Sequence, residues 1–164
     1  MDKLHHYEIS ILWTGNLGAG TATPRAYSRD HEVSADGPGT LAGTSDPAFR
    51  GDPARWNPEQ LLVASVAQCH MLWYLGLAAA AKVTVTAYED HPTGSMAVAE
   101  NGSGQFTGIT LRPQVTITAD SDADAARALH GRVGDYCFIA RSVNFPIQHE
   151  ETILQELGDT TTDT

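Results

Sequence analysis

The sequence predicts an α+β fold in which a long, buried central helix packs against antiparallel sheets. Residues 55–81 form a nearly uncharged apolar segment of helical length, and stretches typical of β-strands lie on both sides of it. Of the 164 residues, 41% are hydrophobic and 18% charged, as in a globular domain. We therefore expect one domain over residues 1–164, with a core at about 6–153 and a frayed tail at 158–164.

The segments before the central helix read as short strands joined by loops. Residues 6–14 alternate apolar and polar positions, and residues 25–34 form a second strand-like stretch. The glycine- and proline-rich region 35–57 reads as a loop with a short strand at 39–43. A loop of this length predicts either a functional lid or a segment that packs on a partner subunit.

The start of the central helix is well marked. Asn57 is a candidate N-cap, Pro58 suits the first helical position, and Gln60 is placed for a capping box. Residues 61–81 approach the length of a membrane span. The polar residues 68–70 at its centre and the absence of flanking basic clusters favour a buried helix of a soluble protein instead.

The second half of the chain predicts strands followed by a shorter helix. Residues 83–90 are rich in β-branched side chains, and segments 95–100 and 105–119 form a hairpin around an Asn-Gly turn. A helix is expected at about 121–136, which places Cys137 at its end or on a following short helix. Residues 142–152 could close the sheet as a last strand.

Charge and cysteine content exclude several classes of function. A formal net charge of −10 argues against a surface that follows nucleic-acid phosphates. Two cysteines are too few for a disulfide scaffold. The N-terminal residues lack the pattern of a secretory signal, so we expect a cytoplasmic protein with reduced thiols. The seven histidines show no metal-ligand spacing, and we predict no metal site.

Cys69 taken alone reads as a small buried hydrophobe. His70 does not change this, because adjacent helical positions point about 100° apart. A reactive thiolate needs a positive neighbour, since an unperturbed thiol is only about 3% ionised at neutral pH. The arginines of the preceding segment could supply it. Glu59 lies ten residues before Cys69, about 15 Å along the helix, so only a second copy or a returning loop could unite them.

Two motifs together resemble the OsmC/Ohr family of osmotically inducible and organic hydroperoxide resistance proteins. The first comprises residues 57–62, NPEQLL, and residues 67–69, AQC, on the central helix. The second is residues 137–142, CFIARS. The order of expected elements also agrees with this family, and the resemblance covers roughly residues 6–153.

The resemblance implies roles for individual residues. Cys69 matches the peroxidatic thiol, and Cys137 matches the resolving thiol that would form a disulfide with it. Glu59 matches the glutamate that holds an arginine against the thiolate. Arg50 is the preferred match for that arginine, and Arg25 is the alternative.

The resemblance also implies an OsmC-like fold, an intertwined homodimer and active sites at the subunit interface. His70 and Trp56 are the expected residues of the substrate pocket. His70 replaces the usual aromatic residue of the well-known branches, so we expect it to shape the pocket or its packing and not to act as a base. No cofactor is implied; the expected reductant is an external dithiol, such as one of the lipoyl type.

We therefore predict a cysteine-based, peroxiredoxin-like peroxidase that reduces organic hydroperoxides, with hydrogen peroxide as a further substrate, in an oxidative stress response. Cys69 would form a sulfenic acid that Cys137 resolves. The alternative is a protein of the same fold that senses redox state or binds a small molecule, with little peroxidase turnover. An unrelated structural domain is a third interpretation.

Overall fold

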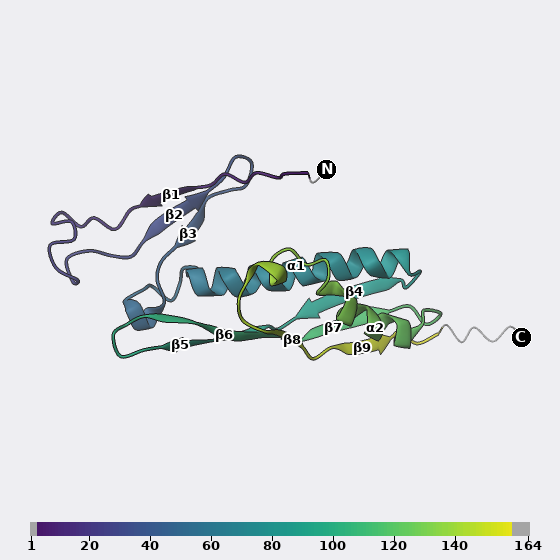
Figure 1. Cartoon of the computed structure of the whole chain (residues 1–164). Helices are drawn as coiled ribbons and strands as arrows, with labels where there is room; N and C mark the ends of the chain where they lie inside the picture. The colour runs from purple at the N-terminus through teal and green to yellow at the C-terminus, as the bar shows by residue number, and fades with distance from the viewer. Residues whose placement is uncertain (1–2, 159–164) are drawn as a thin grey trace, which may run out of the picture. The chain divides into compact units, whose positions relative to one another are not determined.

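The computed structural model describes residues 3–158, so most of the predicted frayed tail lies outside the described residues. The chain divides into two compact units, Met1–Leu62 and Val63–Thr164. The expectation of one domain stays a prediction, because compactness does not test independent folding. The predicted α+β class is confirmed by helices and sheets within one chain (Figure 1).

The first unit contains a small antiparallel sheet in the order β1-β2-β3. Its strands are shorter than the predicted stretches: β1 (Ser10–Trp13), β2 (His31–Ser34) and β3 (Leu41–Gly43). Pairing continues irregularly beyond β1, where the Ser28 amide donates to the carbonyl of Gly15 at 3.0 Å. The predicted loop at 35–57 also contains a 3₁₀ turn, η1 (Pro47–Phe49).

Helix α1 (Pro58–Ala80) begins where the sequence predicts it. The Gln60 amide donates to Oδ1 of Asn57 at 2.8 Å, and the Asn57 amide donates to Oε1 of Gln60 at 3.2 Å. This is the predicted capping box, which satisfies two amides that lack helical partners. The helix ends before Lys82, whose φ of 61° lies in the left-handed region typical of helix C-termini.

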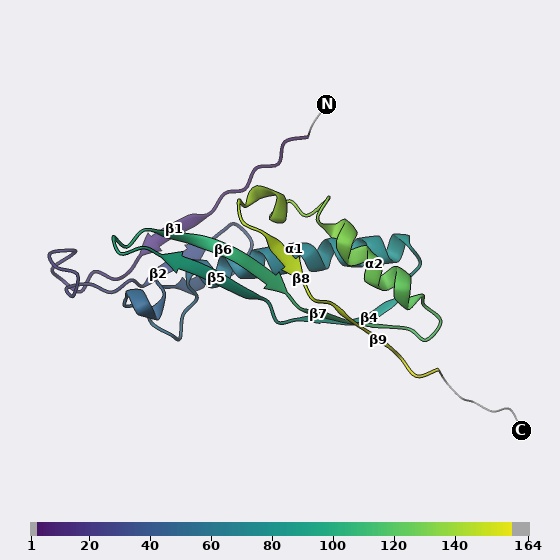
Figure 2. The ribbon, with the colours of Figure 1, turned by 60° about the horizontal axis from the view of Figure 1, so that its bottom comes forward.

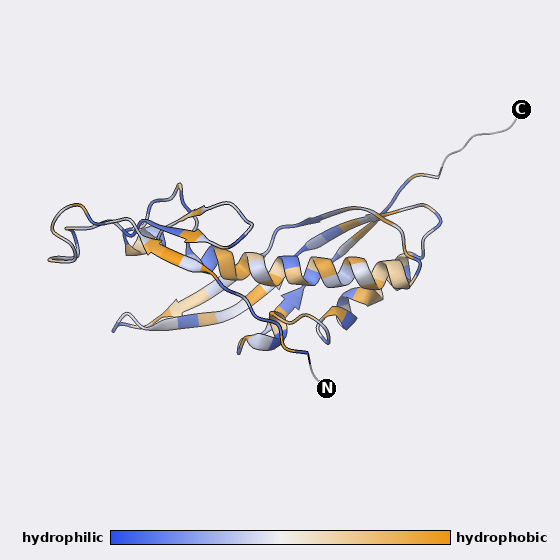
Figure 3. Cartoon of the chain, turned by 90° about the horizontal axis from the view of Figure 1, so that it is seen from above, coloured by the Kyte–Doolittle hydropathy of each residue, from blue (hydrophilic) through white to orange (hydrophobic). Residues whose placement is uncertain are grey.

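Helix α1 has the length and apolarity of a membrane span, with a mean hydropathy of 1.5 (Figure 3). One of its faces nevertheless belongs to the protein core: every fourth residue is buried, namely Val66, His70, Tyr74 and Ala78. This spacing is the helical repeat, and it makes α1 the predicted core helix. Leu72, on another face, is 62% exposed in the single chain.

The second unit contains two three-stranded sheets. One has the order β4-β7-β9, formed by β4 (Val85–Asp90), β7 (Pro113–Ile117) and β9 (Thr152–Gln155). The other has the order β5-β6-β8, formed by β5 (Thr93–Val98), β6 (Gly104–Leu111) and β8 (Ile147–His149). Strands β8 and β9 run parallel to their neighbours, so the sheets are mixed and not wholly antiparallel.

Two predicted strands are each divided in the structure. Residues 105–119 break between β6 and β7 at Arg112, whose amide donates to Oδ1 of Asp90 at 2.7 Å instead of joining a strand ladder. Pro113, which follows, has no amide hydrogen to donate. The predicted last strand at 142–152 contains β8, whereas β9 begins at its last residue, extends beyond it and joins a different sheet. The apolar pattern indicates strands here but not where one sheet ends and the next begins.

Helix α2 (Ala123–Val133) and the 3₁₀ turn η2 (Ala140–Ser142) complete the second unit. Asp122 caps α2 by accepting hydrogen bonds from the amides of residues 124 and 125. Figure 2 shows α2 lying alongside the later turns of α1. Together they cover β7 with a common core of Tyr74, Ala78, Val115, Ile117, Ala126, Leu129 and Val133. Because of this packing, the chain segment that follows α2 begins inside the core.

Candidate functional site

The structure brings the two cysteines together. Cys69 lies in the middle of α1, and Cys137 lies in the segment between α2 and η2. Both are free thiols, and Cys69 lies close enough to Cys137 to raise the pKa of the Cys137 thiol. Cys69 packs against the core cluster that contains Cys137. Residues separated by 68 positions in the sequence are thus neighbours in the structure.

The two thiols have different environments. Cys137 is 1% exposed, whereas Cys69 is half-buried. Burial above all, and then the neighbouring Cys69 thiol, raise the pKa of Cys137 to about 11. The Ala140 amide opposes this effect by donating to Sγ of Cys137 at 3.4 Å. Cys137 is therefore a protonated, shielded thiol at neutral pH, and Cys69 is the more accessible of the two.

Apart from His70, the remaining predicted site residues belong to the first unit. Trp56 is held by backbone hydrogen bonds to β3 and its neighbour: its amide donates to Ala42, and its carbonyl accepts from Thr44. Its side chain stays exposed. Arg50 follows η1 with a φ of 70°, an uncommon backbone conformation for a non-glycine residue. Arg25 lies in a turn and is exposed. Within residues 3–158, neither guanidinium makes an ion pair or hydrogen bond.

Glu59, in the first turn of α1, carries an unusual carboxylate. Its Oε2 is shielded from solvent and has no hydrogen-bond partner in the described part of the chain. A buried, unpaired carboxylate oxygen is costly, so this atom calls for a donor from elsewhere. Whether Glu59, Arg50 or Arg25 meets Cys69 stays a prediction.

The side chains of three histidines lie close together near the cysteine pair, and the sequence did not predict this cluster. Nε2 of His70 and Nδ1 of His130 are 2.9 Å apart and share one hydrogen bond. The ring of His149 lies with its centroid 5.9 Å from each of theirs. Their spacings of 60 and 19 residues match no short motif, and nothing in the sequence alone pointed to their convergence. His70 and His130 are both buried.

The paired histidines are neutral at pH 7. Burial lowers the pKa of His70 to about 4 and that of His130 to about 3. His149, which is hydrogen-bonded to Glu151 at 2.7 Å, adds to this lowering, and Glu151 opposes it. The ring of His130 also stacks on Tyr74 at 4.0 Å between centroids. Within residues 3–158, no three His, Cys, Asp or Glu side chains could hold a metal ion.

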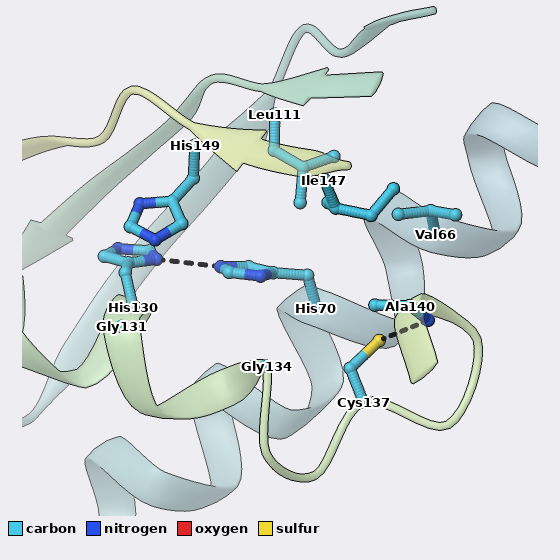
Figure 4. Close-up of a pocket in the computed structure, with 10 residues that line it drawn as sticks. All are labelled: Val66, His70, Leu111, His130, Gly131, Gly134, Cys137, Ala140, Ile147 and His149. Carbon is cyan, nitrogen blue, oxygen red and sulfur yellow. Dashed lines mark hydrogen bonds between the residues drawn. The ribbon is translucent and has the colours of Figure 1, made fainter. Parts of the chain in front are cut away.

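A cavity of about 190 Å³ connects the histidines with Cys137 (Figure 4). Its polar wall consists of His70, His130 and His149. Its apolar wall consists of Val66, Leu111, Ala140 and Ile147. Figure 4 shows His70 turned toward His130, with Cys137 on another side of the cavity. His70 thus lines a cavity that adjoins Cys137, and its assignment to a substrate pocket stays a prediction.

Comparisons with known proteins show which family and fold the chain shares. A family model described as OsmC-like protein matches residues 51–152, whereas no curated protein matches the chain. An OsmC-like protein of unknown function from Vibrio cholerae is 27% identical, with a TM-score of 0.81, and the match covers 90% of this chain and 99% of that one.

Two solved structures of organic hydroperoxide resistance proteins share the fold. The protein from Elizabethkingia anophelis is 15% identical, with a TM-score of 0.68, over 95% of this chain and 100% of that one. The protein from Legionella pneumophila is 16% identical, with a TM-score of 0.65, over 93% of this chain and 99% of that one. The family model covers more than half of the sequence. The chain therefore belongs to the family of OsmC-like proteins.

Proposed function

We propose that this chain is a cysteine-based peroxidase that reduces organic hydroperoxides. The observation that carries the proposal is the contact between the half-buried thiol of Cys69 and the buried thiol of Cys137. A peroxidase of this type needs one accessible thiol to attack the peroxide and a second thiol within reach. The names of the proteins from Elizabethkingia and Legionella support the substrate class.

The proposed reaction has three steps. The Cys69 thiolate attacks the O–O bond of the hydroperoxide, takes one oxygen as a sulfenic acid and releases an alcohol. The Cys137 thiol then attacks the Cys69 sulfur, which forms an S–S bond and releases water. An external dithiol reduces this disulfide by exchange and becomes a disulfide itself. The chain itself supplies only thiols to this cycle, and no cofactor is proposed.

A peroxide assay with thiol variants tests this proposal. Wild-type protein is mixed with an alkyl hydroperoxide and a dithiol, and peroxide loss is followed beside Cys69→Ser and Cys137→Ser. We expect Cys69→Ser to abolish turnover and Cys137→Ser to form the Cys69 sulfenic acid without the intramolecular disulfide. No peroxide loss in the wild type with several dithiols would contradict the proposal. A disulfide that forms without turnover would instead favour the redox-sensing alternative.

We propose that an arginine pairs with Glu59 and stabilises the reacting thiolate. The unpaired Oε2 of Glu59 and the unpaired guanidinium of Arg50 support this pairing, with Arg25 as the alternative. Guanidinium stays charged in an apolar site, so it suits this role. Removal of one such stabilising donor costs about 10²–10³-fold in rate. Arg50→Gln should cause this loss and Arg25→Gln should not; the reverse result would assign the role to Arg25.

We propose a cytoplasmic homodimer as the working state. Large apolar side chains support a second copy as the partner: Ile11 and Leu12 in β1 are each 60% exposed, and Leu72 of α1 is also uncovered. Such a partner would also supply a second set of arginines for Glu59. Sedimentation at micromolar concentration should give twice the mass of the 17.5 kDa chain. A monomer under these conditions would remove this part of the proposal.

A further inference from the structure

The cavity behind the cysteine pair reaches only one of the two thiols. Cys137 lines it, whereas Cys69 is not among the described residues of its wall. Gly131 and Gly134, which also line it, are solvent-exposed at the end of α2 and have no side chains to close the opening. The cavity therefore opens beside these glycines and leads inward to the sulfur of Cys137.

The inner wall of this cavity has an unmet hydrogen-bonding group. His130 is 1% exposed, and its Nε2 is buried without a partner among the described residues. The other ring nitrogen of His130 is already engaged with His70. A buried imidazole nitrogen without a partner is costly, but this atom is enclosed and does not meet a molecule in the cavity without movement of the ring. The rest of the wall combines two further histidines with aliphatic side chains.

The size and charge of the cavity limit what can enter. At about 190 Å³ it exceeds the roughly 150 Å³ that can hold a six-carbon ring. His70 and His130 are uncharged at neutral pH, and the carboxylate of Glu151 lies near them. These features suit a slim, uncharged molecule that carries a hydrogen-bonding group. They disfavour bulky anionic thiols such as glutathione.

We propose that this cavity is the docking site of the reducing dithiol and that the dithiol attacks Sγ of Cys137. The inference rests on the proposed peroxidase function, because it concerns the disulfide formed in that cycle. A thiolate of the reductant forms a bond with the Cys137 sulfur, the Cys69–Cys137 bond breaks, and Cys69 leaves as a thiolate. The second thiol of the reductant then attacks its own bound sulfur. It leaves as a cyclic disulfide, and Cys137 recovers a proton.

The leaving-group chemistry agrees with this direction of attack. In thiol–disulfide exchange, the sulfur with the lower thiol pKa leaves faster. Burial raises the pKa of Cys137 to about 11, which makes it a poor leaving group. Attack on Cys69 would require Cys137 to leave as a buried thiolate. Attack on Cys137 from the cavity makes Cys69 the first leaving group. Cys137 leaves only in the second, intramolecular step, in which the proton released by the attacking thiol of the reductant passes to Cys137.

The first test locates the mixed disulfide in wild-type protein. The Cys69–Cys137 disulfide is prepared with a small aromatic disulfide reagent and no peroxide, and 2-mercaptoethanol is added as an uncharged monothiol. The freed cysteine is alkylated, and tryptic peptides are weighed; cleavage after Arg55, Lys82, Arg132 and Arg141 separates the two cysteines. We expect the mercaptoethanol adduct on Cys137 and the alkyl group on Cys69. The opposite pattern, or failure to form the disulfide, would overturn the proposal.

The second test uses substitutions that narrow the opening of the cavity. A Cβ added at Gly131 or Gly134 meets no atom within 4 Å, so Gly134→Leu and Gly131→Leu can place a side chain at the opening. Reduction of the prepared disulfide by dithiothreitol should slow at least tenfold in these variants. Ala128→Leu, on the exposed side of α2, is the matched control and should reduce at the wild-type rate. Equal rates in all four proteins would overturn the docking site.

These tests separate the two proposals. Because the disulfide is made without peroxide, an inactive wild type in the peroxide assay contradicts only the proposed function. If a leucine variant fails to fold, as seen by circular dichroism, the other variant and the wild-type adduct map still decide the question.

Discussion

Two neighbouring pairs of residues link α1 with the α2 region, and they differ in almost every physical respect. Cys69 contacts Cys137, and one residue further along α1, His70 contacts His130. The cysteine pair includes the half-buried thiol, whereas both histidines are buried. Successive helical positions point about 100° apart, so the side chains of adjacent residues face different surroundings. A reactive thiol and an internal polar cavity can thus share one turn of one helix, with Cys137 between them.

The same physical cause acts on both pairs in opposite directions. Burial disfavours charge, so it raises the pKa of the Cys137 thiol and lowers the pKa of both imidazoles. Cys137 and both histidines are therefore held in their neutral forms at pH 7. The cysteine pair should therefore stop stabilising the folded state at high pH, and the histidine pair should stop stabilising it at low pH. This difference can be measured.

The largest expected effect is acid destabilisation by the histidine pair. The folded-state pKa values of about 4 and about 3 lie below the ordinary value of 6.5, so the unfolded chain binds more protons below that pH. Stability that is present above pH 6.5 is lost as the pH falls toward those values. The loss by about pH 4 is on the order of 3 kcal/mol per histidine. Urea unfolding as a function of pH measures it.

The control for the acid effect replaces both imidazoles without removing polar groups. The double variant His70→Gln, His130→Asn should have a flatter acid slope, while His91→Asn, at an exposed site, should keep the wild-type slope. Some slope remains from Glu151: burial raises its pKa, but the hydrogen bond with His149, a backbone hydrogen bond and the nearby imidazoles together outweigh this and lower it. An acid slope of wild-type steepness in the double variant would contradict the assignment.

The next effect is alkaline and belongs to the reduced cysteine pair. The folded-state pKa of Cys137, about 11, lies above its ordinary value of 9.0, so the stabilising contribution is complete below pH 9 and is lost as the pH rises through 11. The loss is on the order of 2 kcal/mol. It is measured as the difference between wild type and Cys137→Ala, which cancels the contribution of Tyr74, whose pKa burial raises to about 12. A constant difference between pH 8 and about 10.5 would argue against a buried thiol.

The cysteine pair could be anticipated from the sequence, and the histidine pair could not. Cys69 and Cys137 lie in two local motifs whose resemblance to a family places them in one site. The His70–His130 contact depends on how α2 packs on α1, and no local pattern records that packing. His149 comes from β8, which the sequence did not separate from β9. Long-range strand order and helix packing are tertiary properties, so single-residue patterns carry little information about them.

Elements with local signals were predicted best. The capping box at Asn57 and Gln60 marked the start of α1 to the residue, because a cap is a contact within one turn. The break at Arg112 was missed, because it depends on Asp90 in a different strand. The arginine that supports Cys69 stays a prediction for the same reason: its partner would have to come from a distant segment or a second copy.

A smaller effect concerns the support of the histidine pair by Tyr74. The Tyr74 hydroxyl donates to the carbonyl of Ala126 in α2 at 3.1 Å, and its ring stacks on His130. Tyr74→Phe keeps the ring and removes the hydrogen bond, which should cost about 1 kcal/mol of unfolding free energy. The rate of disulfide formation between the cysteines should not change. A larger effect on that rate than on stability would mean that the two pairs are coupled.

The smallest expected effect is on stability and comes from a substitution on the side of α2 that lines the cavity. It tests whether that effect is independent of the redox state of the cysteine pair. Gly131 lies inside α2, its φ is not positive, and an added Cβ would meet no atom within 4 Å. Because glycine is a poor helix former, Gly131→Ala should stabilise the protein by about 0.5–1 kcal/mol. Thermal unfolding of reduced and disulfide-bonded protein measures the gain, which should be equal in both states. A gain in the reduced state alone would show that closing the disulfide moves the end of α2, and the cavity would then differ between the two redox states.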